Sequence, residues 1–307
     1  MQIYLPIADL PVNIFLVLGM GLAVGFISGM FGIGGGFLMT PLLIFIGVTP
    51  AVAVASVASH IAASSFSGAI NYWRKRALDI ALALMLLSAG IVGTATGVWL
   101  FTKLRELDQL DLVIGLSYVT LLTAVGCLMI YESLRAVIRA RHGMPATLRR
   151  PGSHTWLHGL PFKLRFKRSK IYVSAIPVWA IGFLIGFVGA IMGIGGGFLL
   201  VPMLIYFLRV PTATVIGTSM VLTLVTMASA TVMHAVTNHL VDAVLALILM
   251  VGGVIGAQFG ARTGQRMRGE RLRLLLGLLV FAVGLRFAYA LVVRPEDLYS
   301  LRNVGFE

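Results

Sequence analysis

Charged residues are scarce in this chain, and their scarcity excludes an ordinary soluble domain. Only 11% of the 307 residues are charged, whereas 59% are hydrophobic, and soluble domains carry about 25% charged residues. Apolar runs of roughly 20 residues are long enough to cross about 30 Å of hydrocarbon as helices. They recur at 11–30, 79–100, 111–131, 172–192, 241–261 and 273–293. The alternating polarity of a β-barrel is missing from them. The sequence therefore predicts an all-α polytopic membrane protein.

Cysteine is nearly absent, because Cys127 is the single example and lies inside an apolar run. One thiol excludes a disulfide framework and a cysteine-based zinc site. We expect Cys127 to be a small residue of the apolar core. The first ten residues contain no Lys or Arg, so they do not resemble a signal peptide. We expect the first span to remain in the mature protein.

The apolar runs lack the acidic residues of a sodium-coupled transporter, and the chain lacks the nucleotide-binding motifs of an ATP-driven one. No Asp or Glu falls clearly inside an apolar run, and Asp79 and Asp242 stand where helix N-caps are expected. A sodium site built on carboxylates therefore lacks its usual parts. No P-loop lysine follows a glycine cluster. The sequence thus predicts no ATP hydrolysis by this chain and no cofactor.

A glycine-rich motif occurs twice, as GMFGIGGGFLMTP at 29–41 and AIMGIGGGFLLVP at 190–202. At the sixth position of a dinucleotide-binding motif stand Phe37 and Phe198, so that interpretation fails. The copies align at an offset of 161 residues, and an offset of 163 pairs Ser56 with Ser219 and Asp79 with Asp242. We expect a duplicated membrane unit: a first repeat at 1–131, a linker at 132–170 and a second repeat at 171–307.

Basic residues are distributed in a way that indicates inverted repeats. The linker carries ten basic and no acidic residues between Ser133 and Lys170. Nucleic-acid binding is one interpretation, but the positive-inside rule explains a basic cytoplasmic loop more economically, with contact to membrane lipids as an addition. The loop at 74–76 is basic, whereas its equivalent at 238–242 has no Lys or Arg; the loops 103–111 and 262–273 reverse that bias. We therefore expect equivalent loops on opposite sides and both termini in the periplasm.

The glycine clusters precede apolar stretches that are too short to span the membrane. The stretches 36–48 and 197–209 would reach only about 20 Å as helices. Short segments interrupted by Gly and Pro at matching positions are typical of transporter binding sites. Glycine lets freed backbone N–H groups turn toward a ligand, and a helix N-terminus favours an anion. Close helix packing is the alternative. We favour packing for the spaced pairs Gly93/Gly97 and Gly256/Gly260, and a site for 32–36 and 193–197.

Two polar stripes follow the short stretches. Ser56, His60 and Ser67 share one helical face in the first half, and Ser219, Thr223 and Thr226 share the equivalent face in the second. The stripes are predicted to face each other along a polar path, the alternative being hydroxyl bonds to the preceding turn. His60 and His234 are the histidines in predicted membrane segments, so they are candidates for proton coupling or structural residues.

The GIGGGF…P motif occurs twice, and each copy is followed by an Ala/Ser/Thr-rich segment and a helix that begins at an Asp. This pattern resembles the TauE/SafE family of sulfite exporters. The resemblance implies transport of sulfite, sulfonates or related carboxylate anions across the bacterial inner membrane. The first half reads Ala55-Ser56 where the family's Thr-Ser pair is kept as Thr218-Ser219. By motif and by placement, the candidate substrate-binding residues are Gly32, Gly34, Gly35, Gly36, Ser56, Ser59, His60, Gly193, Gly195, Gly196, Gly197, Thr218, Ser219 and Thr223.

Four functions stay open at this point. A secondary transporter for a small anion is favoured, and a passive anion channel is the alternative within transport. A membrane-embedded enzyme would need a nucleophile–base or metal constellation, which two unpaired histidines do not supply. A receptor that moves no substrate has only the basic linker in its favour. No metal site is predicted.

Overall fold

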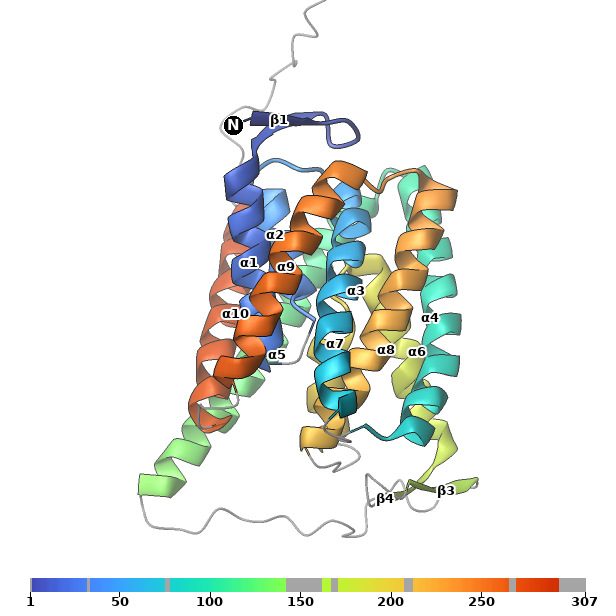
Figure 1. Ribbon diagram of the computed structural model, residues 1–307, viewed down its shortest axis with the longest axis vertical. Helices are drawn as coiled ribbons and strands as arrows, with labels where there is room; N and C mark the ends of the chain where they lie inside the picture. The colour runs from blue at the N-terminus through green and yellow to red at the C-terminus, as the bar shows by residue number, and fades with distance from the viewer. Residues whose placement is uncertain are drawn as a thin grey trace, which may run out of the picture.

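The computed structural model describes residues 2–31, 34–74, 78–141, 162–166, 171–206, 212–264 and 269–292, and they form a bundle of helices (Figure 1). Among them, seven helices are long and apolar enough to cross a membrane: α1 Ile14–Phe31, α3 Pro50–Arg74, α4 Ile80–Glu106, α5 Leu110–Arg141, α6 Ala175–Met192, α8 Thr212–Met233 and α9 Ala243–Gly264. The helices α2 Gly36–Phe45 and α7 Gly197–Tyr206 are short, and α10 Gly269–Val292 completes the bundle. The predicted class, an α-helical polytopic membrane protein, is confirmed.

Each half opens with a β-hairpin that the apolar runs did not predict. Strand β1 Gln2–Leu5 pairs antiparallel with β2 Leu10–Asn13, and β3 Lys163–Phe166 pairs antiparallel with β4 Ile171–Ser174. These four strands, like α1/α6 and α2/α7, correspond at an offset of 161. The structural repeat therefore begins at Gln2 and Lys163, and the second start lies inside the segment expected as linker.

The two hairpins lead into their helices through equivalent caps. The side chain of Asn13 accepts a bond from the backbone N–H of Phe15 at 3.0 Å, and Ser174 accepts one from Ile176 at 3.3 Å. Such caps satisfy backbone donors that the first helical turn leaves without a partner. Helix α5 continues to Arg141, ten residues past the expected boundary at 131. Residues 142–161 of the expected linker lie outside the described part.

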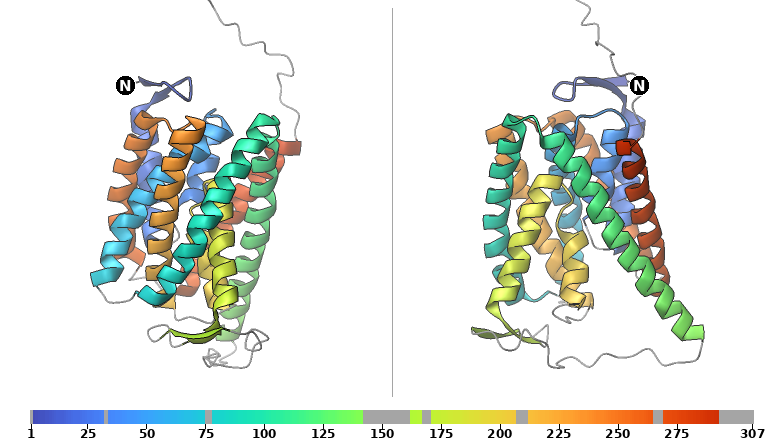
Figure 2. Two further views of the ribbon diagram at one scale, coloured as in Figure 1. Left: turned by 90° about the vertical axis from the view of Figure 1, so that its right-hand side faces the viewer. Right: turned by 180° about the vertical axis from the view of Figure 1, so that it is seen from behind.

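The helices pair across the two halves. Helix α1 packs most extensively on α9, α6 on α4, α3 on α8 and α5 on α10. In the repeat, α1 corresponds to α6, α4 to α9, α3 to α8 and α5 to α10. The α1/α9 and α6/α4 pairs are therefore equivalent to each other, while α3/α8 and α5/α10 each pair a helix with its own counterpart. The β1/β2 hairpin and the start of α1 lie at one end of the bundle, here named the upper end, while β3/β4 and the start of α6 lie at the lower end (Figure 1). Helix α10 finishes at the upper end (Figure 2). This arrangement supports inverted repeats, which stay a prediction.

Glycines make the closest cross-half contacts. A Cβ on Gly25 of α1 would lie 2.7 Å from the Cα of Gly253 on α9. A Cβ on the equivalent Gly186 of α6 would lie 3.0 Å from the Cα of Gly90 on α4. These separations are below ordinary van der Waals contact, so only glycine fits. The pairs Gly93/Gly97 and Gly256/Gly260 likewise face the backbones of α6 and α1: Gly93 faces Phe183, and Gly256 faces Leu22. Their predicted packing role is confirmed.

Both predicted aspartate caps are present. The Asp79 carboxylate accepts from the N–H of Leu82 at 3.3 Å, and that of Asp242 accepts from Val244 and Leu245 at 3.1 and 3.0 Å. Asp242 also accepts from the N–H groups of Ile7 and Ala8 in the turn between β1 and β2. Asp242 thereby joins the hairpin to α9 at the upper end.

The expectation that Cys127 belongs to the core was wrong. Its side chain is exposed on α5, a helix whose membrane-crossing part is mostly outward-facing. A small apolar side chain tolerates a lipid-facing position as readily as a core position, so the apolar run alone did not distinguish the two.

Candidate functional site

Both glycine clusters interrupt the helix, as the sequence predicts. Gly34 and Gly35 have φ angles of 86° and 71°, and the equivalent Gly195 and Gly196 have 74° and 48°. Side chains rarely adopt this left-handed region, so glycine is required for the turn. Gly193 is left-handed as well, with φ of 64°. Gly32, its counterpart and a candidate residue, lies outside the described residues.

The two breaks come together in the interior. A Cβ on Gly34 would lie 3.2 Å from the carbonyl oxygen of Gly195, although 161 residues separate the two positions. The rings of Phe37 and Phe198, which follow Gly36 and Gly197 at the starts of α2 and α7, stack with centroids 4.7 Å apart. The N-termini of two helices thus converge inside a membrane bundle, and both contribute partial positive charge there.

The breaks are packed in this conformation. The Cγ2 atom of Ile61 on α3 lies 3.2 Å and 2.6 Å from where a Cβ would stand on Gly34 and Gly195, respectively. The hydroxyl of Thr223 on α8 donates to the carbonyl of Gly195 at 3.0 Å. An anion that binds the backbone here must therefore displace the Ile61 side chain.

Most predicted hydroxyl residues have local partners. Ser59 donates to the carbonyl of Ser56 at 2.6 Å, and Ser219 donates to that of Ile216 at 2.8 Å. This is the alternative in which the hydroxyl bonds the preceding turn. Ser56 instead accepts from the N–H of Asp242 at 3.0 Å and so joins α3 to α9. Thr218 is buried, and its hydroxyl lacks a partner among the described residues.

The prediction that the two polar stripes face each other was wrong. The ring of His60 on α3 packs against Gly253 of α9, and Thr226 on α8 packs against Gly90 of α4. The first stripe therefore faces α9, through His60 and through Ser56. In the second stripe Thr226 faces α4, whereas Thr223 lies at the glycine breaks. We name these contacts the α3/α9 seam and the α4/α8 seam. They exchange with each other when the halves are exchanged.

His60 is only half satisfied. Its Nδ1 lies 2.7 Å from the carbonyl oxygen of Leu249, so Nδ1 carries the proton and donates. Its Nε2 is buried and has no partner among the described residues. A buried polar atom without a partner costs free energy, which water or a ligand in this place would recover.

His234 is fully satisfied and closes the upper end of the α4/α8 seam. It lies in the π-helical turn η2 His234–Asn238, with Nε2 3.2 Å from the carbonyl of Ala190 and Nδ1 3.2 Å from the side-chain amide of Asn238. Asn238 in turn accepts a bond from Thr102 at 3.0 Å on its side chain, and one from Arg105 at 3.0 Å on its backbone carbonyl. These bonds tie α8 to α4.

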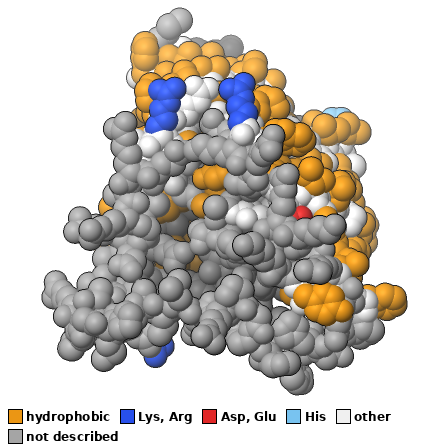
Figure 3. All heavy atoms as spheres, turned by 60° about the horizontal axis from the view of Figure 1, so that its bottom comes forward, with side chains coloured by type: hydrophobic (Ala, Val, Ile, Leu, Met, Phe, Trp, Pro, Cys, Tyr) orange, Lys and Arg blue, Asp and Glu red, His pale blue; other side chains and the backbone are white. Residues whose placement is uncertain are grey.

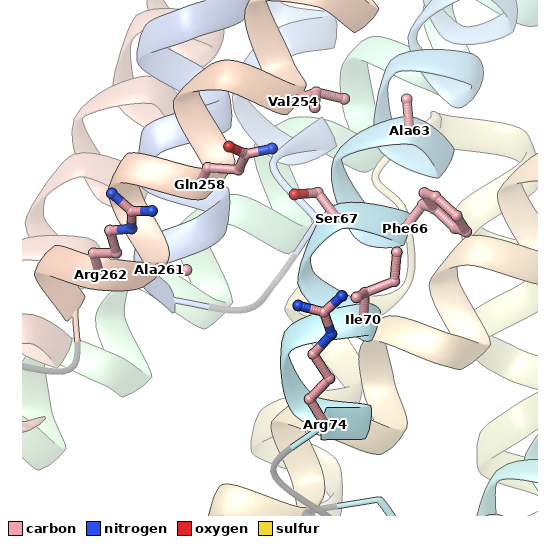
Figure 4. A pocket seen from close by; sticks show the side chains of 9 residues that line it. All are labelled: Ala63, Phe66, Ser67, Ile70, Arg74, Val254, Gln258, Ala261 and Arg262. Carbon is pink, nitrogen blue, oxygen red and sulfur yellow. The ribbon is translucent and has the colours of Figure 1, made fainter.

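The lower end of the α3/α9 seam contains a cavity of about 340 Å³. Its walls come from the last turns of α3 and α9, as Figure 4 shows. Viewed from the lower end, basic side chains lie among hydrophobic ones on the described surface (Figure 3). The lining residues are Ala63, Phe66, Ser67, Ile70, Arg74, Val254, Gln258, Ala261 and Arg262. Ser67 is the one member that the polar stripe identified.

A signal for the others existed in the repeat. At an offset of 163, the positions of Ser67, Gln258 and Arg262 are occupied by Ala230, Ala95 and Trp99. Arg74 corresponds to Thr237. The cavity thus collects positions at which the two halves depart from each other, and a search for such departures would have found it.

The comparisons with known proteins agree with this architecture. Residues 17–287 match the family model described as Sulfite exporter TauE/SafE. A probable membrane transporter protein of Xylella fastidiosa (strain 9a5c) is 30% identical over 283 residues, which cover 89% of this chain and 94% of that protein. The probable membrane transporter protein YunE of Bacillus subtilis (strain 168) is 23% identical over 278 residues, or 88% of this chain and 95% of that protein.

A shorter similarity extends to plants. Sulfite exporter TauE/SafE family protein 1 of Arabidopsis thaliana is 45% identical over 53 residues, which cover 17% of this chain and 12% of that protein. No solved structure matches the chain. With its family match over nearly the whole length, its apolar helices and its doubled glycine break, the chain belongs to the TauE/SafE sulfite exporter family.

Proposed function

We propose that this protein is a secondary transporter that moves a small anion, sulfite or a related organosulfur or organic anion, across the bacterial inner membrane. The observation that carries the proposal is the meeting of Gly34 and Gly195 in the bundle interior. Two broken helices turn their N-termini toward one place, where backbone N–H groups and helix dipoles favour negative charge. Broken helices at the centre of a repeated membrane fold are the usual form of a carrier's binding site.

The orientation in the membrane follows from the charges. The basic loops 74–76 and 262–273 and the basic segment 132–170 are expected in the cytoplasm. Since Arg74 and Arg262 end α3 and α9 at the lower end, we place the lower end in the cytoplasm and both chain termini in the periplasm. The α3/α9 cavity then opens toward the cytoplasm.

Transport by a carrier is favoured over the other classes. A passive channel needs a continuous polar path, whereas Ile61 is packed between the two breaks. An enzyme needs grouped catalytic side chains, whereas His60 and His234 lie on different seams. A receptor that moves no substrate would not need two helix breaks buried in the membrane bundle. The named relatives are probable membrane transporters, which supports the same choice.

Counterflow in proteoliposomes tests the proposal. Vesicles loaded with unlabelled sulfite, taurine, sulfoacetate or succinate are diluted into the same labelled anion, and transient accumulation of label is followed. A carrier exchanges label against the internal pool. A channel dissipates the gradient without accumulation, an enzyme changes the substrate, and a receptor moves no label. Absence of counterflow with every anion tested would contradict the proposal.

Alanine substitution at the breaks tests the location of the site. Gly35→Ala and Gly196→Ala force a methyl group into the left-handed region, which strains the turn whose backbone would bind the anion; the methyl group would also press on Val24 and Ser28 in α1, or on Ile185 in α6. We expect affinity to fall roughly ten- to hundredfold, as for loss of one charge-assisted hydrogen bond. The control is Gly93→Ala on α4, which faces Phe183 in a packing contact and should lower the melting temperature at unchanged affinity. Equal affinity in all three folded variants would place the anion elsewhere.

A further inference from the structure

The cavity at the lower end of the α3/α9 seam brings together two cations and, among the described residues that line it, no anion. Arg74 and Arg262 lie on opposite sides of the gap between α3 and α9 (Figure 4). None of the nine lining residues is Asp or Glu. Within the described ranges, the one ion pair is Lys103–Glu106, far along the chain on α4. Two guanidinium groups that share a cavity repel each other unless an anion lies between them.

The rest of the lining suits an anion with an organic body. The side chains of Ser67 and Gln258 lie deeper and provide hydroxyl and amide groups. Phe66, Ile70 and Val254 provide apolar walls. The cavity volume of about 340 Å³ lies at the small end of the range for ligand pockets, about 300–1,000 Å³. Sulfite, with four non-hydrogen atoms, would leave most of that space filled with water and would leave the apolar walls without a contact.

The fold itself does not require this set of residues. At the equivalent positions on the α4/α8 seam stand Ala230, Ala95, Trp99 and Thr237, none of which is charged. The equivalent positions thus hold two alanines, an exposed tryptophan and a threonine in one seam, and a serine, a glutamine and two arginines in the other. A purely structural role would suit either set, whereas a ligand that enters from one end requires the polar set at that end alone.

The cavity also leads toward the glycine breaks. Ala63 lines it, and His60 lies one helical turn further inward on the same face of α3. The Nε2 atom of His60 has no partner among the described residues. The neighbouring residue Ile61 contacts Gly34 and Gly195. Arg74 itself is 14 residues, or about 21 Å, from His60 along α3, so an anion at the arginines lies at the outer end of a seam whose inner end holds the unsatisfied histidine.

We propose that this cavity is an anion-binding vestibule, in which Arg74 and Arg262 hold a carboxylate or sulfonate group and the apolar walls hold a short hydrocarbon body. Binding at this place is independent of transport, but the idea that the vestibule loads the interior site rests on the proposed function. The same oxyanion chemistry exists in free organic anions and in anionic lipid headgroups. We assign the free anion, because the polar groups of Ser67 and Gln258 continue inward beyond the arginines.

Calorimetric titration of the purified full-length protein with propane-1-sulfonate and with sulfite tests the vestibule. The protein is held in nanodiscs of phosphatidylcholine, which carries no net charge. We expect propane-1-sulfonate to bind more tightly than sulfite. Arg74→Gln and Arg262→Gln should each weaken it roughly ten- to hundredfold, the usual loss for a charge-assisted bond. Arg74→Lys should weaken it less, because lysine keeps the charge without the planar fork.

Arg135→Gln on α5 is the matched control, since Arg135 is exposed outside the cavity. Equal affinity in the wild type, the cavity variants and this control would overturn the vestibule. Nanodiscs with phosphatidylglycerol, analysed by native mass spectrometry, separate the two sources of the anion. Retention of phosphatidylglycerol that Arg74→Gln and Arg262→Gln abolish, with no binding of propane-1-sulfonate, would overturn the free anion and assign a lipid headgroup.

The proposed function and the vestibule fail in different ways. Binding of propane-1-sulfonate that depends on the arginines, without counterflow of any anion, supports the vestibule and contradicts the carrier. Counterflow that is unchanged in Arg74→Gln and Arg262→Gln supports the carrier and overturns the idea that the vestibule loads the interior site, whereas binding in the vestibule is decided by the titration. Both arginines are exposed, so the variants are expected to fold, and their melting temperatures verify this.

Discussion

The two seams of the molecule are built from equivalent helices but end differently. At its lower end, the α3/α9 seam holds a cavity lined by Arg74 and Arg262. At its upper end, the α4/α8 seam is tied by Asn238, which accepts bonds from Thr102 and Arg105 and contacts His234. One seam is thus open toward one side of the membrane, while its counterpart is held together on the other side.

If the protein is the carrier proposed above, this difference predicts how it alternates between its two states. In a carrier with two equivalent halves, switching to the opposite state gives each half the conformation that the other half had before. Each seam then takes the arrangement that its counterpart had. A ligand shifts such an equilibrium only by the difference between its affinities for the two states. We therefore expect the upper seam to open when the lower seam closes, and the tests below weaken one seam at a time.

The largest effect is expected from Asp242→Ala, which releases the upper end of the α3/α9 seam. The Asp242 carboxylate accepts from four backbone N–H groups, and its own N–H donates to Ser56. Loss of the carboxylate should destabilise the fold by about 3 kcal/mol or more, because several buried donors lose their acceptor. Asn13→Ala removes one exposed cap and should cost about 1 kcal/mol. Equal melting temperatures for the two variants would contradict this ranking.

The next effect concerns the tie that closes the α4/α8 seam. Asn238→Ala removes the acceptor of the Thr102 hydroxyl and the amide that contacts His234. We expect a destabilisation of about 1–2 kcal/mol and an opening toward the upper end. A cysteine at Ala95, introduced after Cys127→Ser, should then react faster with a water-soluble maleimide.

Thr102→Val is the control for this closure, because it removes one of the bonds to Asn238 and keeps the amide. It should raise the reactivity at position 95 less than Asn238→Ala does. If neither variant changes the rate, Asn238 does not hold the upper end closed.

A smaller effect separates the two histidines. His60 keeps a nitrogen without a partner in the described part of the chain, whereas both nitrogens of His234 have partners. In counterflow measured from pH 5 to pH 8, His60→Gln should change the pH profile. His234→Gln should keep that profile and lower the melting temperature. A pH profile that is unaltered in both single variants would make both histidines structural.

The last test fixes the membrane orientation and should leave transport unchanged. In a Cys127→Ser background, Lys103→Cys in the last turn of α4 and Thr263→Cys in the last turn of its equivalent helix α9 are labelled in intact cells with an impermeant maleimide. The inverted-repeat prediction, with periplasmic termini, requires labelling of position 103 from outside and protection of position 263. Labelling of both from the same side contradicts the inversion.

Much of the fold followed from composition and repetition. Long apolar runs must be helices in a membrane, because every backbone polar group needs a partner within its own segment. The repeated glycine motif then predicted two short helices after the breaks at Gly34 and Gly195, and the structure has both. The hairpins were not predicted, since strands of four residues lack a period that distinguishes them from the adjacent apolar runs.

The site was harder to predict than the fold. Helical spacing showed correctly that Ser56, His60 and Ser67 share a face, but it does not specify which helix that face contacts. The cross-half contact with α9 decides this, and it depends on the long-range fit of Gly253 against the His60 ring. Arg262 and Gln258 were missed because, along the sequence, they resemble the ordinary polar end of a membrane helix.

The cross-half glycine contacts have a consequence for how the protein is made. Helix α1 packs mainly on α9, and α4 packs mainly on α6. Since Gly25 faces Gly253 and Gly93 faces Phe183, neither half buries these glycine faces by itself. While the chain is being inserted, the first half must wait in the bilayer with Gly25 and Gly93 facing lipid, until the ribosome has delivered the second half. Two separately expressed halves should therefore be degraded alone and should rescue each other when produced together, much as two fragments of one enzyme can complement.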